Sequence, residues 1–340
     1  MNSLKNSPLV RVTDRGLYCS AGDFYIDPWA PVSNALITHA HSDHARVGHQ
    51  NYFATELSVP ILKKRLGADI KIRGLNYREP ITLGGVKVSF HSAGHILGSA
   101  QIRVDNGGPV WVISGDYKRD SDPSCAPFEV VPCDVFITEA TFALPVYRWE
   151  PTEQIAAQIY AWWDRNRSAN KASVLFCYAL GKAQRLLAEL AKITDRTVFT
   201  HGAVESLVEV YRQAGVAMCP TQKVSEAESP KKCQEFAGEL ILAPPSAQGS
   251  SWMRRFGDAD TGFASGWMRI RGSRRRRGYN RGFSLSDHAD WPSLLRTVKE
   301  TGAKMVYATH GYSEILSRSL QESGIEAATL KTTYAGEAET

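Results

Sequence analysis

Three histidines and one aspartate fall within six residues near the start of the chain: His39, His41, Asp43 and His44. The short apolar run before them, residues 35–38, predicts a buried strand. Because residues two apart in an extended chain point to the same side, His39 and His41 are predicted to face one point in space. Asp43 and His44 follow where the chain turns, and can face a second point close by. Imidazole nitrogens and carboxylate oxygens are the ligands of zinc-like ions, so this segment predicts a metal site.

Further polar side chains follow apolar segments later in the chain. Predicted strands over 86–91, 110–113 and 305–309 precede His95, Asp116 and His310. Ligand sites in layered α/β folds gather at strand ends, so these three residues join the candidate ligands. Two zinc-like ions need roughly seven protein ligands when sharing or water supplies the rest. The candidates now number about seven, which is enough for two ions.

Three other histidines receive structural interpretations. His91 lies inside a predicted strand, and His49 lies beyond the first motif. His201 falls in a region with a different pattern of elements and is left out of the site.

The elements that must position these residues form more than one lobe. The chain has 340 residues, of which 43% are hydrophobic, enough for a large core and for two lobes. From about Pro151 the pattern changes to strands alternating with helices, the first helix being predicted over 152–167 with Thr152 as its N-cap. A strand followed by a polar turn returns near Gly282. We therefore expect an α/β protein in which residues 1–150 and 281–340 form a metal-binding lobe and residues 151–280 form an inserted lobe.

Composition restricts the class of protein. No run of about 18 apolar residues is present, so no membrane span is predicted, and the first ten residues lack the apolar region of a signal peptide. The six cysteines are scattered without a close pair, which is typical of reduced thiols in a cytoplasmic protein.

The positive charge is concentrated in one segment. The net charge is +5, and the segment from Arg254 to Arg281 holds nine arginines and only two acidic residues. We expect its central arginines to meet backbone phosphates of a nucleic acid, and a solvated loop is the alternative interpretation. These are Arg271, Arg274, Arg275, Arg276 and Arg277. Trp267 and Tyr279 lie among the arginines, and either base stacking or core packing accounts for them.

The metal motif resembles the signature of the metallo-β-lactamase fold. The segment 93–100 resembles the third-ligand segment of nucleases with this fold, and Ser114-Gly115-Asp116 resembles the segment of the bridging aspartate. The resemblance implies an αββα sandwich that holds two metal ions. It assigns the first ion to His39, His41 and His95, the second to Asp43, His44 and His310, with Asp116 between them.

Four further segments resemble the β-CASP branch of this fold. They are Glu139-Ala140-Thr141, Gly181-Lys182-Ala183-Gln184, Ser286-Asp287-His288-Ala289-Asp290 and Thr309-His310-Gly311. The resemblance implies that the inserted lobe is β-CASP-like, that Glu139 orients a metal-ligating histidine and that His288 lies near the scissile phosphate. Lys182, at a helix start, either suits a phosphate or is an ordinary solvated residue.

The later motifs also resemble the bacterial DNA ligase-associated exonuclease group, in segments 265–268, 271–277, 283–291 and 309–312. Members are typically encoded beside an ATP-dependent DNA ligase and a helicase, which implies a functional association with both. The resemblance implies a metal-dependent DNA exonuclease of DNA repair. The insert over 151–280 is small for a β-CASP lobe, which leaves the strandedness and length of the substrate open.

The expected reaction is hydrolysis of a phosphodiester bond with two divalent cations, zinc first, with manganese and iron as alternatives. Asp43 or Asp116 steers the attacking water, and His288 protonates or hydrogen-bonds a phosphate oxygen, with Glu139 as a further catalytic residue. An RNA nuclease of the same branch shares every motif and is the main alternative. A small-molecule hydrolase explains the metal motif but not the arginine-rich segment. A non-catalytic scaffold is disfavoured because all seven ligands are present.

Overall fold

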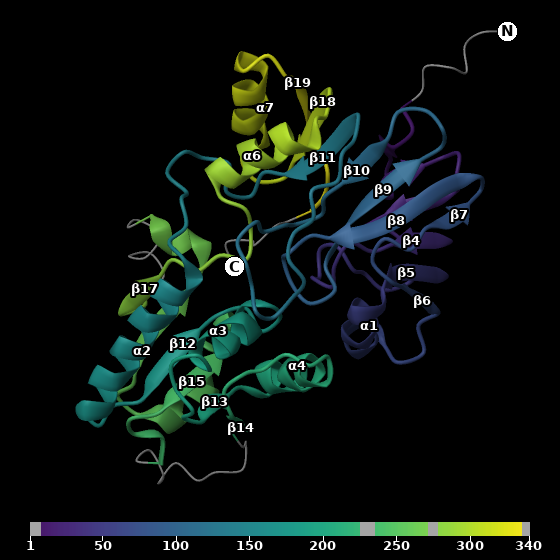
Figure 1. Cartoon of the computed structure of the whole chain (residues 1–340). Helices are drawn as coiled ribbons and strands as arrows, with labels where there is room; N and C mark the ends of the chain where they lie inside the picture. Colours follow the sequence, from purple (N-terminus) through teal and green to yellow (C-terminus); the bar gives the residue numbers. More distant parts are fainter. Residues whose placement is uncertain (1–7, 225–234, 271–277, 335–340) are drawn as a thin grey trace, which may run out of the picture. The chain divides into compact units, whose positions relative to one another are not determined.

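The computed structural model of the chain describes residues 8–224, 235–270 and 278–334, which divide into two compact units (Figure 1). Unit 1 takes its described residues from 8–121, 125–145 and 288–334. Unit 2 takes its described residues from 122–124 and 146–287. The second unit is thus an insertion in the first, and its boundaries differ by a few residues from those predicted.

Unit 1 contains two sheets. The first sheet has the order β1 (Arg11–Val12), β2 (Leu17–Cys19), β3 (Phe24–Ile26), β4 (Asn34–Leu36), β5 (Asn51–Thr55) and β6 (Ile72–Leu75). The second has the order β19 (Glu326–Leu330), β18 (Met305–Thr309), β11 (Val135–Glu139), β10 (Trp111–Ile113), β9 (Ala100–Asp105), β8 (Val86–Ser92) and β7 (Ile81–Leu83). β19, β18, β11 and β10 are parallel, so their carboxyl ends meet at one edge.

The second sheet is apolar on both faces because its side chains alternate between two cores. Ile113 and Ile137 pack with Leu36 and other residues of the first sheet, between the two sheets. Val112 and Phe136 point the opposite way and pack under two helices, α6 (Trp291–Thr301) and α7 (Ser313–Glu322). Figure 1 shows α7 beside β18 and β19.

Local sequence signals define the helices of unit 1. The Asp290 side chain accepts from the Ser293 amide at 3.0 Å and caps α6, which ends at Gly302 in the left-handed conformation. α1 (Val59–Leu66) follows the short 3-10 helix η1 (Glu56–Ser58) and contacts β6. Two stacked sheets with helices outside them confirm the predicted α/β sandwich.

Unit 2 is a smaller α/β layer structure. Its sheet is parallel throughout and has the order β14 (Thr221–Lys223), β13 (Val198–Thr200), β15 (Leu240–Ala243), β12 (Ser173–Phe176), β16 (Asp260–Ala264) and β17 (Arg281–Phe283). One face packs against the helices α2 (Thr152–Ser168), α3 (Lys182–Leu190) and α4 (Gly202–Gln213). The other face packs against the 3-10 helices η4 (Ser251–Phe256) and η5 (Gly266–Arg269), with η3 (Pro245–Ala247) nearby in the chain. This is the inserted lobe that the alternating pattern predicts.

Three details differ from the predictions. β17 pairs with β16 in parallel register, with Gly262 opposite Arg281, and so completes the sheet of unit 2. Residues 281–287 therefore belong to unit 2 and not to the metal-binding lobe. Pro151 is the residue before α2, and Thr152 is its first helical residue, so Thr152 is not the cap. The sequence predicts a helix over 181–193 with Ile193 on its apolar face, but α3 ends at Leu190, and Ile193 lies beyond it with an exposed side chain. Within the described residues, we find no helix whose length and apolarity would allow it to span a bilayer.

Candidate metal centre

The candidate ligands of unit 1 follow strand ends. The turn after β4 is closed by hydrogen bonds from the His44 and Ala45 amides to the His41 carbonyl, at 3.2 and 2.8 Å. Asp116 follows β10 through Gly115, which has a positive φ of 55°. A Cβ at position 115 would lie 2.7 Å from the Cβ of Thr38. Glycine therefore allows the end of β10 to approach the segment that carries His39.

Asp116 lies at the centre of the cluster and is almost fully buried. Its Oδ2 atom is 3.4 Å from His39 Nε2 and 3.8 Å from His95 Nε2. Its Oδ1 atom is 3.6 Å from His44 Nε2 and 3.1 Å from His310 Nε2. One carboxylate thus presents one oxygen to each of two histidine groups.

The first group consists of His39, His41, His95 and Asp116, whose potential ligand atoms all lie within 4.8 Å of one another. His41 Nδ1 and His95 Nε2 are 3.0 Å apart. This is the set that the resemblance assigns to the first ion, together with the carboxylate expected between the ions.

The second group consists of His44, His310 and Asp116, under the same 4.8 Å limit. Asp43 lies beside it, with Oδ2 at 3.6 Å from His44 Nε2. The structure thus brings all seven predicted ligands into one region of unit 1. A further group, outside the predicted ligand set, combines Asp116 with Glu139 and His288.

The chemistry of these residues fits two cations. The Nε2 atoms of His39 and His44 are buried, and neither forms a hydrogen bond of normal geometry to the residues that the structure describes. A buried nitrogen in this state is costly unless something else uses its lone pair or proton. Imidazole and carboxylate donors are suitable for zinc and also for manganese or iron. The site can therefore hold divalent metal ions, and its donors do not select one metal.

Burial and neighbouring charges set the protonation of the site. Burial lowers the pKa of His39 to about 3, with a further contribution from His44, which favours the neutral form that binds a metal. Burial also lowers the pKa of His44, but the carboxylates of Asp43, Asp116 and Asp27 outweigh it and raise that pKa to about 10. Burial raises the pKa of Asp116, but His44 and His288 hold it well below its usual range, so the central carboxylate is charged.

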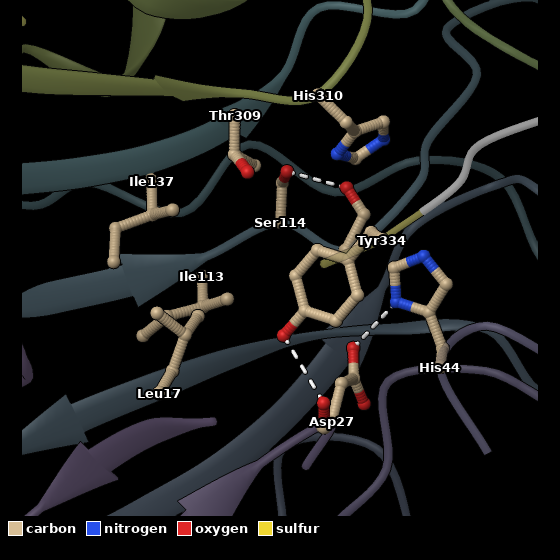
Figure 2. Close-up of a pocket in the computed structure, with 10 residues that line it drawn as sticks. Leu17, Asp27, His44, Ile113, Ser114, Ile137, Thr309, His310 and Tyr334 are labelled. Atoms are coloured by element: carbon tan, nitrogen blue, oxygen red, sulfur yellow. Dashed lines mark hydrogen bonds and ion pairs between the residues drawn. The ribbon is translucent and has the colours of Figure 1, made fainter. Parts of the chain in front are cut away.

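Asp27 is a site residue that the sequence analysis missed. Its carboxylate accepts hydrogen bonds from the Thr38 amide at 2.7 Å and the Thr38 hydroxyl at 2.5 Å. Its Oδ2 atom is 2.8 Å from His44 Nδ1, so it orients the imidazole that faces Asp116 (Figure 2). Asp27 directly follows β3, so the rule that selected the other ligands was sufficient to find it.

Glu139 and His288 form a pair beside the ligand groups. Glu139 is the last residue of β11, and its Oε2 atom is 2.8 Å from His288 Nδ1. Its Oε1 atom accepts from the Tyr117 amide at 2.7 Å. The carboxylate therefore fixes the ring of His288, whose Nδ1 atom is 4.0 Å from Asp116 Oδ2. The expected partner of Glu139 was one of the metal-ligating histidines.

Backbone strain occurs at two residues of the centre. His310 has a φ of 38° and Asp27 a φ of 42°, in the left-handed region that non-glycine residues rarely adopt. Such conformations cost about 1–3 kcal/mol and persist where surrounding contacts determine them. Both residues are held by the cluster, His310 through Asp116 and Asp27 through Thr38.

The expected substrate-binding residues have other surroundings in unit 2. Lys182 is fully buried, its Nζ atom lies 3.3 Å from Asp287 Oδ2, and it is therefore not a solvated helix-start residue. We assign its charge to this ion pair rather than to a phosphate. Tyr279 is buried and stacks on Phe263 with ring centroids 4.9 Å apart, which is core packing. Trp267 packs partly buried against the same core.

The predicted phosphate contacts of the arginine run lie outside the described residues. These are Arg271, Arg274, Arg275, Arg276 and Arg277. The histidines given structural interpretations have partners elsewhere. His91 contacts Glu129 at 3.0 Å, the Val32 amide donates to His49, and His201 caps α4.

The sequence is similar to several known proteins. The chain is 30% identical over 314 residues to a protein named "Probable DNA ligase" from Opitutus terrae, covering 92% of this chain and 30% of that protein. Over 121 residues it is 31% identical to "Endoribonuclease YSH1" from Yarrowia lipolytica and to "Cleavage and polyadenylation specificity factor subunit 3" from Dictyostelium discoideum. Those matches cover 34% of this chain and 14% and 15% of the two proteins. The predicted resemblance to the β-CASP branch of metallo-β-lactamase fold nucleases is confirmed.

Two further comparisons define the extent of the likeness. The chain spans less than a third of the length of each of these relatives. A solved structure of a protein of unknown function from Enterococcus faecalis V583 shares the fold, with a TM-score of 0.59 over 87% of this chain and 78% of that chain, at 12% identity. No protein-family model matches the sequence.

Proposed function

We propose that the chain is a metal-dependent nuclease that removes nucleotides from DNA ends by hydrolysing phosphodiester bonds, in DNA repair. The observation that carries the proposal is the position of Asp116, whose two carboxylate oxygens face two separate histidine groups. A carboxylate in this position suits two neighbouring cations, which is the arrangement of enzymes that cut phosphodiesters.

We assign different roles in ion binding and water orientation to the residues of unit 1. His39, His41 and His95 would hold one ion, and Asp43, His44 and His310 would hold the other, with Asp116 shared. When bound, zinc, manganese or iron ions supply Lewis acidity and lower the pKa of a coordinated water. Asp43, at the edge of the second group, accepts a hydrogen bond from the attacking water and so orients it.

We assign His288 to proton transfer or hydrogen bonding with a phosphate oxygen of the substrate. Because Glu139 engages its Nδ1 atom, Nε2 is the nitrogen that exchanges a proton with, or donates a hydrogen bond to, a phosphate oxygen. The Glu139 carboxylate stabilises the protonated ring during that step, as a buried acid does for a general base.

DNA is favoured over RNA by the extent of the similarities. The relative named as a DNA ligase matches 92% of the chain, whereas the endoribonuclease matches 34% of it. A functional association with a DNA ligase accords with that name, and we include an ATP-dependent ligase and a helicase as partners in the proposal. An RNA nuclease is the second candidate, since the endoribonuclease match is 31% identical over its 121 residues.

The test is digestion of end-labelled single-stranded DNA, duplex DNA and RNA by metal-stripped protein supplied with zinc, manganese or iron. We expect stepwise shortening of DNA from one end with at least one of these metals. His41→Ala should abolish it, and His91→Ala, a histidine of the same unit outside the ligand groups, should not. Preferential cleavage of RNA would select the second candidate, and no cleavage of any nucleic acid would reject both.

A further inference from the structure

The last described segment of the chain returns to the metal centre of unit 1. After β19, Thr332 Oγ1 lies 2.6 Å from Thr309 Oγ1, and Thr309 directly precedes His310. The hydroxyl of Tyr334 donates to the Asp27 carbonyl at 3.2 Å. Hydrogen bonds of Thr332 and Tyr334 therefore hold the segment 331–334 against Thr309 and Asp27, which adjoin the second ligand group.

The ring of Tyr334 lies flat against one ligand and edge-on to another. Its centroid is 4.6 Å from that of His44, with an interplanar angle of 12°. It is 6.0 Å from the centroid of His310, at 79°. Figure 2 shows the phenol ring beside His44, with Asp27 at the hydroxyl end of the ring. Among the described contacts, this one buried side chain touches both histidines of the second group and none of the three histidines of the first group.

The contacts constrain His44 in two different ways. The bond from His44 Nδ1 to Asp27 fixes the direction of the ring, and the stacked phenol fixes the plane of the ring. The space around these residues is small, a cavity of about 10 Å³ lined partly by Leu17, Ile113 and Ile137. Such a space holds at most about one water molecule, so the imidazole cannot easily rotate away. Removing the phenol would remove one of the two constraints and open the space behind His44.

We propose that Tyr334 is a positioning residue for the second metal ion, and that the affinity for that ion depends on the segment 331–334, which follows β19. The inference rests on the proposed two-metal function. It assigns Tyr334 no contact with the substrate and no effect on the first ion, which uses His39, His41 and His95.

The experiment measures metal content rather than activity alone. Wild type, Tyr334→Leu and Tyr334→Phe are stripped of metal and titrated with cobalt, followed by absorption, with elemental analysis after dialysis. We expect two ions in wild type, a second site weakened about 10- to 100-fold in Tyr334→Leu, and near wild-type binding in Tyr334→Phe, which keeps the ring. Tyr307→Leu is the matched control, since Tyr307 stacks on Trp111 in the same unit, away from the ligands.

The outcomes separate this inference from the proposed function. Unchanged affinity for both ions in Tyr334→Leu overturns the inference and leaves the nuclease proposal intact. A wild-type protein that binds fewer than two ions overturns the proposed two-metal function itself. If Tyr334→Leu does not fold, Thr332→Val decides, because it keeps the ring and removes only the tether to Thr309. We expect weaker binding of the second ion in that variant, and equal binding overturns the inference.

Discussion

Among the residues that the structure describes, each unit holds a cluster of buried charged or titratable side chains, and the two clusters are built differently. The cluster of unit 1 gathers histidine nitrogens around the Asp116 carboxylate. The cluster of unit 2 gathers two cations and two carboxylates. Arg185 Nη1 is 2.9 Å from Asp287 Oδ1, Lys182 Nζ is 3.3 Å from Asp287 Oδ2, and the Arg185 Nε atom pairs with Asp122.

The difference concerns where the positive charge comes from. Burying a charge is expensive unless it is paired and hydrogen-bonded. In unit 2 the lysine and arginine side chains balance the two aspartates, and the chain itself completes the cluster. In unit 1 the donors point at two common positions, and the natural partners of such donors are metal ions. The same physical requirement therefore predicts a structural cluster in one unit and an ion-binding cluster in the other.

The comparison is tested most severely at Asp116. We expect Asp116→Asn to lose both bound ions and to slow hydrolysis of DNA by at least about a thousandfold, because bound metal ions supply several kcal/mol of transition-state stabilisation. Metal content by elemental analysis and single-turnover cleavage measure the two effects. Asp105→Asn, in the same unit but paired with Arg103, is the control and should change neither. Full metal content in Asp116→Asn would contradict the central role of this carboxylate.

The cluster of unit 2 should respond in stability instead. Arg185→Ala leaves Asp122 and much of Asp287 without their cation, and removal of one partner from a buried pair costs about 3–5 kcal/mol of unfolding free energy. The control is Arg196→Ala, whose pair with Asp164 is partly exposed and should be worth about 1 kcal/mol or less. Denaturant unfolding measures both variants. Equal losses in the two variants would mean that burial does not distinguish this cluster.

Asp27 sharpens the comparison within unit 1. Asp27→Asn keeps the shape of the side chain but weakens its hold on His44 Nδ1, and losses of this kind cost about 10- to 100-fold in metal affinity. We expect the loss at the second ion only, measured by titration of the metal-free protein. Glu129→Gln is the control, because Glu129 contacts His91 outside the ligand groups. Equal weakening of both ions would show that Asp27 stabilises the whole centre rather than His44.

The sequence predicted most of the residues that cluster in unit 1 because these candidate ligands follow strands of plain apolar pattern. His39 and His41 come from one strand end, and Asp116 and His310 come from two others, so the layered fold brings them together. Asp27 obeyed the same rule, but a single aspartate after a three-residue strand was not recognised without the contact to His44. Tyr334 could not be found, since no local pattern links the segment after β19 to the ligand groups.

The unit 2 assignments show the limit of local reasoning. A lysine at a helix start can face solvent, bind a phosphate or pair with a carboxylate. Its partner Asp287 lies far along the chain from Lys182, so the local sequence did not reveal the pair. The three-residue strand β17 was likewise compatible with either sheet until its pairing with β16 was known. Of the residues at the start of α3, Gly181 is the one whose type is explained by its own backbone conformation, because its φ of 91° favours glycine.

The smallest expected effect concerns Lys182 and decides what its charge does. If it serves the buried cluster, Lys182→Met leaves the salt dependence of DNA binding unchanged, whereas loss of a true phosphate contact lowers the slope of log affinity against log salt by about one. Asp287 keeps Arg185 at 2.9 Å, so the variant should still fold. Arg274→Ala is the comparison, since the arginine run is expected to meet phosphates. Binding isotherms at several salt concentrations measure the slopes. A reduced slope in Lys182→Met alone would mean that Lys182 contacts a phosphate of the substrate.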